Sequence, residues 1–186
     1  MERFLGKYSP YLYALLRIIS GLMFAMHGSQ KLFGWLGGPG LAGTGGFFHS
    51  LGFRPGKPMA IVAGVSEAGA GALLALGLFT PLASTAVIGT LVVAGSVHRA
   101  NGLWAQNGGY ELSLVYVTAA TALAFTGSGA YSLDNALGLD GLAGTGPGVA
   151  AVVAGALSGL VVIRRGSRAV AADAVPKAVV GERVPA

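Results

Sequence analysis

The sequence predicts an all-α membrane protein: a transmembrane bundle of four core helices, followed by a fifth, C-terminal helix. Three observations support this fold class. Only 10% of the 186 residues are charged, whereas soluble domains average roughly 25%. Hydrophobic residues make up 53% of the chain, and they form runs close to the roughly 20 residues that a spanning helix needs. Glycine is abundant, with 32 residues, and small residues let helices pack closely in lipid.

Five apolar segments are candidate transmembrane helices. Four of them form the core of the predicted bundle, and the first of these carries an unusual number of polar residues. The fifth follows a polar, glycine-rich loop and is itself rich in Ala and Gly. The five segments cover residues 10–33, 58–79, 82–98, 110–126 and 147–163.

The fifth segment contains Gly155 and Gly159, four residues apart on one helix face. This spacing is typical of close helix contacts in membranes. We therefore divide the chain into a four-helix membrane domain over residues 1–146 and an additional transmembrane helix over residues 147–163. A basic, disordered tail in the cytoplasm is expected over residues 164–186.

Lys and Arg are distributed unevenly between the two sides of the predicted bundle. With five spans, nine fall on one side and two on the other, and Arg17 lies within the first span. Basic residues favour the cytoplasmic side, so we expect the N-terminus outside and the C-terminus in the cytoplasm. If the fifth segment did not cross, the basic tail would move outside and this asymmetry would be lost. The nine residues are Lys31, Arg54, Lys57, Arg99, Arg164, Arg165, Arg168, Lys177 and Arg183, and the two are Arg3 and Lys7.

The chain has no cysteine and a formal net charge of +5. Without cysteine it has no disulfide, no thiolate metal site and no thiol redox chemistry of its own. Its basic residues lie mainly at segment ends and do not alternate with stacking aromatic residues, so nucleic-acid binding is not expected.

Charged and polar side chains fall within or beside the predicted spans. A charge inside a span costs several kcal/mol unless it is paired or hydrated, so such residues are functional candidates. Spans alternate in direction, so the ends of the first and third meet the starts of the second and fourth at one side. We therefore expect one polar site in that half of the membrane. Its members are His27, Lys31, Glu67, His98 and Glu111.

Glu67 is the most informative of these residues. It shares a helix face with Gly64 and Gly71, so we expect it to be packed inside the bundle among small residues. A buried carboxylate must be protonated or paired. From the helical rise, Arg17 lies toward one surface and His27 toward the other, so we expect Glu67 to contact Arg17 or His27.

Each candidate also has a purely structural interpretation. Glu67 would only lock the bundle through a salt bridge, Arg17 would extend to the outer interface, and Lys31 would be an interfacial anchor. His98 and Glu111 flank a short loop and are expected within about 10 Å of each other, close enough for a water-bridged network. The alternative for this last pair is that both side chains simply face interfacial water.

A series of polar and glycine motifs runs along the chain: Arg17, His27-Gly28, Gln30-Lys31-Leu32-Phe33-Gly34, Gly37-Gly38, Gly43-Thr44, Phe47-Phe48, Glu67 with Gly71, Gly77-Leu78-Phe79-Thr80, His98 with Asn101-Gly102, Gly108-Gly109-Tyr110-Glu111, and Ser132-Leu133-Asp134. In this order the motifs resemble the DoxX family of bacterial integral membrane proteins. The resemblance covers roughly residues 10–140. That family is typically a four-helix bundle, so the segment after Gly146 departs from it.

The resemblance implies association with membrane redox systems. Members of the family are linked to quinol oxidase or thiosulfate:quinone oxidoreductase complexes, to quinone detoxification, and to thiol and superoxide stress defence. It also implies a multi-pass protein of the bacterial cell (inner) membrane. Because the chain lacks cysteine, redox chemistry here would need a quinone, a bound cofactor or a partner subunit.

On this interpretation the protein is a subunit or accessory of a quinone-linked or stress-related redox system. It would contact the lipid bilayer and either a protein partner or a second copy of itself. Quinone is the cofactor to consider, because two histidines without a further signature do not make a haem site, and no metal site is expected. The proton-handling, catalytic candidates are Glu67, His27 and His98, and the ligand-binding candidates are Arg17, Gln30, Lys31, Asn101 and Glu111.

Two other functions stay open at the level of sequence. The protein would be a non-catalytic membrane scaffold that recruits a soluble oxidoreductase, in which case its buried polar residues only specify helix packing. A small-molecule transporter is the third possibility, although the sequence lacks inverted-repeat symmetry.

Overall fold

The computed structural model describes residues 2–174 of the chain. Every regular element in this part is a helix, which confirms the predicted fold class. The α-helices are α1 (Glu2–Phe33), α2 (Gly40–Ser50), α3 (Gly56–Leu76), α4 (Thr80–His98), α5 (Glu111–Thr126), α6 (Leu133–Ala136) and α7 (Thr145–Ala174). Short 3-10 turns lie at η1 (Trp35–Gly37), η2 (Arg99–Asn101), η3 (Ala105–Asn107) and η4 (Asp140–Leu142).

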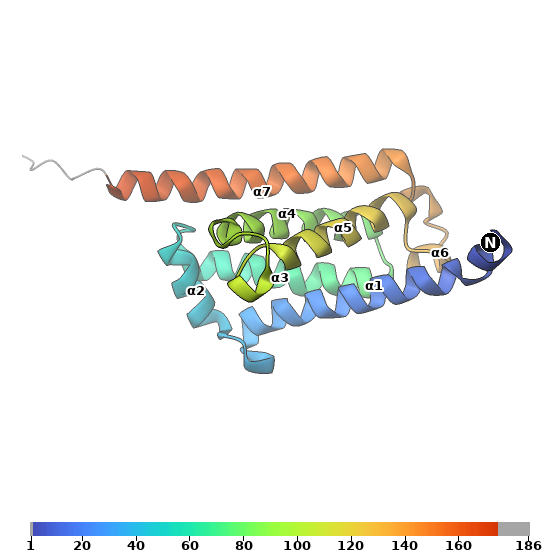
Figure 1. The fold of residues 1–186 in the computed structure, drawn as a ribbon, viewed down its shortest axis with the longest axis horizontal. Helices are drawn as coiled ribbons and strands as arrows, with labels where there is room; N and C mark the ends of the chain where they lie inside the picture. The colour runs from blue at the N-terminus through green and yellow to red at the C-terminus, as the bar shows by residue number, and fades with distance from the viewer. Residues whose placement is uncertain (1, 175–186) are drawn as a thin grey trace, which may run out of the picture.

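The long helices α1, α3, α4, α5 and α7 lie side by side and alternate in direction (Figure 1). Helix α2 and the connection from α4 to α5 lie at one end of this bundle, which we call the α2 end. Helix α6 and the start of α7 lie at the opposite end, which we call the α6 end. This is the arrangement expected of successive membrane crossings.

Four helical segments are long and apolar enough to cross a membrane: Tyr8–Phe33, Gly56–Leu76, Thr80–Asn101 and Thr145–Val170. The last of these contains the predicted fifth span. Helix α5 is shorter, with 16 residues, or about 24 Å at 1.5 Å per residue. The hydrocarbon core is about 30 Å thick, so α5 needs flanking loop residues to complete a crossing.

Helix α7 extends well beyond the predicted limit at residue 163. It continues to Ala174, so Arg164, Arg165 and Arg168 lie in a helix where the sequence predicts the start of a disordered tail. Ala and Arg are among the strongest helix formers, which accounts for the extension. Residues 175–186, the remainder of the predicted tail, lie outside the described residues.

Helices α1 and α3 pack backbone to backbone through two glycine pairs. A Cβ atom added to Gly21 would lie 2.6 Å from the carbonyl oxygen of Gly71, and one added to Gly28 would lie 2.6 Å from that of Gly64. Gly21 and Gly28 are seven residues apart on α1, as are Gly64 and Gly71 on α3, so the two glycines of each helix lie on one face. These glycines fix the antiparallel register of α1 against α3.

Helix α7 packs on α4 in the same way, through glycines that let the two backbones come close. A Cβ on Gly155 would lie 2.8 Å from the Thr85 carbonyl oxygen, and one on Gly159 would lie 2.7 Å from that of Gly89. The predicted small-residue face is therefore the surface by which α7 joins the bundle. Between the two glycine interfaces lies an apolar core that includes Phe24, Leu74, Val87, Ile88, Tyr116 and Leu123.

Candidate functional site

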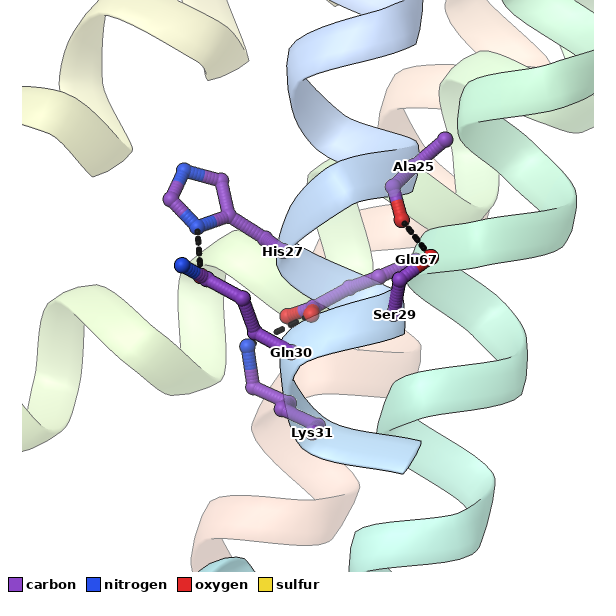
Figure 2. A network of polar contacts seen from close by, with 6 residues as sticks. All are labelled: Ala25, His27, Ser29, Gln30, Lys31 and Glu67. Carbon is purple, nitrogen blue, oxygen red and sulfur yellow. Dashed lines mark hydrogen bonds and ion pairs between the residues drawn. The ribbon is translucent and has the colours of Figure 1, made fainter. Parts of the chain in front are cut away.

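The centre of the site is an ion pair between α1 and α3. Lys31 Nζ donates a hydrogen bond of 2.5 Å to Glu67 Oε2 (Figure 2). The Glu67 side chain is 5% exposed and that of Lys31 is 25% exposed. The expectation that Glu67 is buried in the bundle is thus confirmed. The pair is therefore enclosed on the Glu67 side and partly exposed on the Lys31 side.

The predicted partners of Glu67 were wrong, and side-chain direction explains why. Helical side chains point toward the N-terminus of their own helix. In the antiparallel pair α1 and α3, the Lys31 and Glu67 side chains therefore point toward each other. The Arg17 side chain points toward the N-terminus of α1 and away from Glu67.

His27 lies one turn before Lys31 on α1, but its side chain makes contacts of its own. Its Nδ1 is hydrogen-bonded to Gln30 Oε1 at 3.1 Å, and its ring lies edge-on to Tyr116 of α5 with centroids 6.3 Å apart. His27 is close enough to Glu67 for an electrostatic interaction. The side chain of Gln30 also donates to the Leu36 carbonyl at 3.4 Å, so His27 and Gln30 form a small cluster of their own.

A cavity of about 360 Å³ adjoins the ion pair. Most of its lining is apolar and comes from α3, α4 and α7, and α2 contributes at one end. Lys31 and Glu67 lie in its wall, and His98 lines it from the last turn of α4. The structure therefore brings three of the eight predicted site residues to one cavity. The polar lining residues are Lys31, Ser66, Glu67, Thr90, His98 and Ser158.

Sequence reasoning missed several of the residues that line this cavity. Ser66, Thr90 and Ser158 lie inside apolar helices, where a single hydroxyl is too common to mark a site. Phe47 and Phe48 form one of the motifs along the sequence, but their place at the cavity depends on how α2 folds back over α3. Their neighbour Phe53 lines the cavity as well.

His98, Asn101 and Glu111 hold the loop between α4 and α5. His98 Nδ1 lies 2.8 Å from the Gly108 carbonyl oxygen, and Asn101 Nδ2 donates to the same oxygen at 3.1 Å. Glu111 Oε2 accepts a hydrogen bond of 2.8 Å from the backbone N–H of Ala105. His98 and Glu111 thus bind backbone groups of the loop between them rather than each other.

The contact to Gly108 fixes the tautomer of neutral His98. A carbonyl oxygen only accepts hydrogen bonds, so Nδ1 must carry the proton. Nε2 is then an acceptor that the loop does not use. This leaves His98 able to bind a donor or take up a proton at Nε2.

Arg17 lies near the α6 end, away from the other predicted site residues. Its guanidinium donates to the carbonyl oxygens of Ser128, at 3.1 Å, and of Ala75 and Tyr131. Arg17 is only 3% exposed. It therefore connects α1 to the end of α3 and to the loop after α5, and the predicted extension to the interface is not what the structure shows.

Asp134 completes the polar cluster beside Arg17. Its Oδ1 accepts from the Phe79 N–H at 2.7 Å, and its Oδ2 accepts from the Thr80 N–H at 3.1 Å and the Thr80 hydroxyl at 2.7 Å. These are free N–H groups at the start of α4, so Asp134 caps that helix from the short helix α6. Among residues 2–174, no group of three His, Asp or Glu side chains is arranged to hold a metal ion.

Comparison with known proteins identifies the family of this bundle. A family model described as DoxX matches residues 12–99. A Haemophilus influenzae protein described as uncharacterized is 37% identical over 138 residues, covering 70% of this chain and 94% of its own length. The chain belongs to the DoxX family. No solved structure matches it.

The match to the DoxX model ends directly after α4. It therefore includes the ion pair, His98 and the parts of α2, α3 and α4 that line the cavity. The α7 wall, with Ser158, Gly159 and Val162, lies outside the matched residues. In this DoxX protein the cavity is thus built partly from residues that the family model matches and partly from α7, which lies outside the match.

Proposed function

We propose that this DoxX protein is the membrane subunit of a redox system and that it binds a quinone-type molecule in the cavity between α3, α4 and α7. The observation that carries this proposal is the placement of the Lys31–Glu67 pair and His98 in the wall of a mostly apolar cavity between helices that are long and apolar enough to span a membrane. Ionisable residues inside a membrane are costly and usually mark ligand or proton sites.

The cavity fits a small amphipathic molecule by size and by chemistry. Ligand pockets usually enclose about 300–1,000 Å³, with apolar walls and a few polar groups that fix orientation. The volume of about 360 Å³ lies within this range. A planar ring with two carbonyl oxygens needs hydrogen-bond donors on an apolar wall, and the site supplies both.

The polar residues have distinct roles in this proposal. Lys31 holds three N–H donors and a positive charge where negative charge would develop on a ligand oxygen. Glu67 holds a carboxylate beside it, which takes up or releases a proton as Lys31 turns toward the ligand. His98, with Nδ1 fixed by Gly108, offers Nε2 as a second proton-transfer group.

A bound quinone would supply an acceptor for two electrons and two protons. We assign only the movement of protons to the protein residues, since the chain has no cysteine and residues 2–174 hold no group of three His, Asp or Glu side chains placed to bind a metal ion. We therefore expect a partner oxidoreductase to supply or remove the electrons. The partial exposure of Lys31 gives the protons a route from water at the α2 end.

Purification in native lipid nanodiscs, followed by extraction and mass spectrometry of bound molecules, tests this function. We expect a quinone to co-purify with the wild-type protein and to be depleted at least about tenfold in Glu67→Gln, Lys31→Gln and His98→Gln, because each loses a contact to a buried polar group. His49→Gln is the matched control for His98→Gln, since His49 is exposed and does not line the cavity. Equal quinone content in all five proteins would overturn the proposal.

The direct contact between Lys31 and Glu67 favours one second candidate function, that of a non-catalytic scaffold that recruits a soluble oxidoreductase. With Lys31 and Glu67 in direct contact, the pair neutralises itself and locks α1 to α3. A scaffold would co-purify with its enzyme and carry no quinone. The variants Glu67→Gln and Lys31→Gln would then lower stability without changing enzyme recruitment.

A further inference from the structure

One side of the cavity faces out of the bundle. Helix α7 packs chiefly on α4 and α5, whereas α3 packs on α1, α2 and α4. The cavity lies between these two groups, with walls from α3, α4 and α7. Val62 of α3 and Ser158 of α7 line it and are themselves exposed, Val62 by 58%. The cavity therefore opens sideways between α3 and α7.

This opening lies at the depth of the bilayer. Val62 is within the apolar segment Gly56–Leu76, and Ser158 is within Thr145–Val170, both of which are long and apolar enough to span a membrane. The medium next to the opening is then hydrocarbon rather than water. A ligand that enters by this route has to be soluble in the bilayer.

Aromatic packing narrows the approach from the α2 end. The rings of Phe48 and Phe53 meet with centroids 6.0 Å apart, and Phe53 is 8% exposed. Phe53 lies directly on α7, because a Cβ added to Gly166 would come within 2.8 Å of its ring. The connection from α2 to α3 therefore closes against α7 at this end of the cavity.

We infer that the ligand enters from the bilayer between α3 and α7, with its polar head at Lys31, Glu67 and His98 and an apolar tail left in the opening. This inference rests on the proposed function and narrows its ligand class to long-tailed quinones. The walls between Val62 and Ser158 offer apolar contact to such a tail. A quinone without a tail would lose that contact and bind more weakly.

Tryptophan at the rim tests the opening. In nanodiscs of fixed lipid composition, Val62→Trp should weaken binding of a decyl-substituted benzoquinone at least about fivefold, by filling the space that the tail occupies. Binding of the same benzoquinone with a methyl group in place of the decyl chain should change less than about twofold, because it lacks the tail. The matched control is Val65→Trp, since Val65 is 56% exposed on the same helix but does not line the cavity.

The pattern of losses decides the result. A loss of decyl binding confined to Val62→Trp supports the lateral opening. Equal effects of the two tryptophans on the decyl ligand contradict it. An equal loss of both ligands in Val62→Trp also contradicts it, because the tryptophan would then be filling the head-group site.

A probe that has the apolar tail but no quinone head tests the lateral opening separately from the proposed function. A decyl chain that carries only a photoreactive diazirine should label cavity residues of α3 and α7 in the wild type and in Val65→Trp, and much less in Val62→Trp. If the wild type binds no quinone but shows this labelling, the function is wrong and the opening stands. If the cavity is not labelled, the lateral opening is wrong.

Discussion

Gly28 of α1 lies so close to Gly64 of α3 that a Cβ on Gly28 would come within 2.6 Å of the Gly64 carbonyl oxygen. Lys31 follows Gly28 by about one turn, and Glu67 follows Gly64 by the same interval. Side chains at these positions lean back toward the glycines, each toward its own N-terminus. The close approach of the two backbones is therefore what allows Lys31 to reach Glu67 across the interface.

The close packing of α1 on α3 predicts that alanine substitutions at two neighbouring glycines of α3 have different effects on stability. A Cβ on Gly71 would lie 2.5 Å from the Gly21 carbonyl oxygen, whereas a Cβ on Gly69 meets nothing within 4 Å. We expect Gly71→Ala to destabilise the protein by about 1–3 kcal/mol through overpacking. Gly69→Ala should be neutral or stabilising by up to about 1 kcal/mol through helix propensity.

Thermal unfolding followed by circular dichroism in a mild detergent measures both glycine variants under the same conditions. The close packing of α1 on α3 would be contradicted if the two variants had the same melting temperature. Quinone content provides a second readout. It should fall in Gly71→Ala, because α1 and α3 must separate, and stay unchanged in Gly69→Ala.

Arg17 should matter for stability and not for ligand binding. Its guanidinium bonds three backbone carbonyls, and Met in its place would leave these buried acceptors unpaired, at about 1–3 kcal/mol for each such group. We expect Arg17→Met to lower the melting temperature strongly. Arg17→Lys should recover only part of the loss, since an ammonium does not reproduce the planar guanidinium fork.

Quinone content of the folded fraction distinguishes this structural role from the ligand-binding role suggested by the sequence. Arg17→Met that remains folded should retain quinone at the wild-type level. A stable Arg17→Met protein without quinone would show that Arg17 does contact the ligand.

Much of the fold was predictable because bilayer dimensions act on local sequence. The apolar segments at 58–79 and 82–98 correspond closely to α3 and α4, since chain length and hydropathy decide what can span. The Gly155–Gly159 spacing likewise predicted the packing face of α7. The far end of α7 was missed because its charged residues look like a tail, although they also favour helix.

The partner of Glu67 could not be found from depth alone. The helical rise gives the depth of each residue along its own helix. The register between two packed helices decides which residues of one lie opposite which residues of the other. Here the glycine pairs set the register, and it places Arg17 level with Ala75, about 12 Å from Glu67 at 1.5 Å per residue. The direction of the Lys31 side chain then decides the pairing.

The cavity could not be predicted from the sequence either, because it also depends on how the helices pack. It exists because α7 docks on α4 and α5 rather than on α3, and that choice depends on the shapes of assembled surfaces. Ser66 and Thr90 gain their place in the lining only after this docking.

The orientation of the bundle stays a prediction from charge and can be tested in this cysteine-free chain. Single cysteines at Ser50 and Ser167 report on the α2 end, and Leu137→Cys reports on the α6 end; all three positions are exposed. With the α2 end in the cytoplasm, a membrane-impermeant thiol reagent added to intact cells should label only Leu137→Cys. Permeabilised cells should show labelling of all three, and labelling of Ser50→Cys in intact cells would reverse the orientation.

A double variant separates the structural and chemical roles of Lys31 and Glu67. Glu67→Ala alone leaves the partly exposed ammonium of Lys31 without its partner and should lower stability, and Lys31→Met alone leaves the buried Glu67 carboxylate unpaired and should lower it more, whereas apolar residues at both positions remove both desolvation costs. We therefore expect Lys31→Met combined with Glu67→Met to recover most of the stability, as measured by melting temperature, while quinone stays absent. Lys57→Met, which changes a lysine outside the cavity lining, should alter neither quantity. If the double variant is stable and still contains quinone, the pair is only a lock between α1 and α3, and the scaffold function gains support.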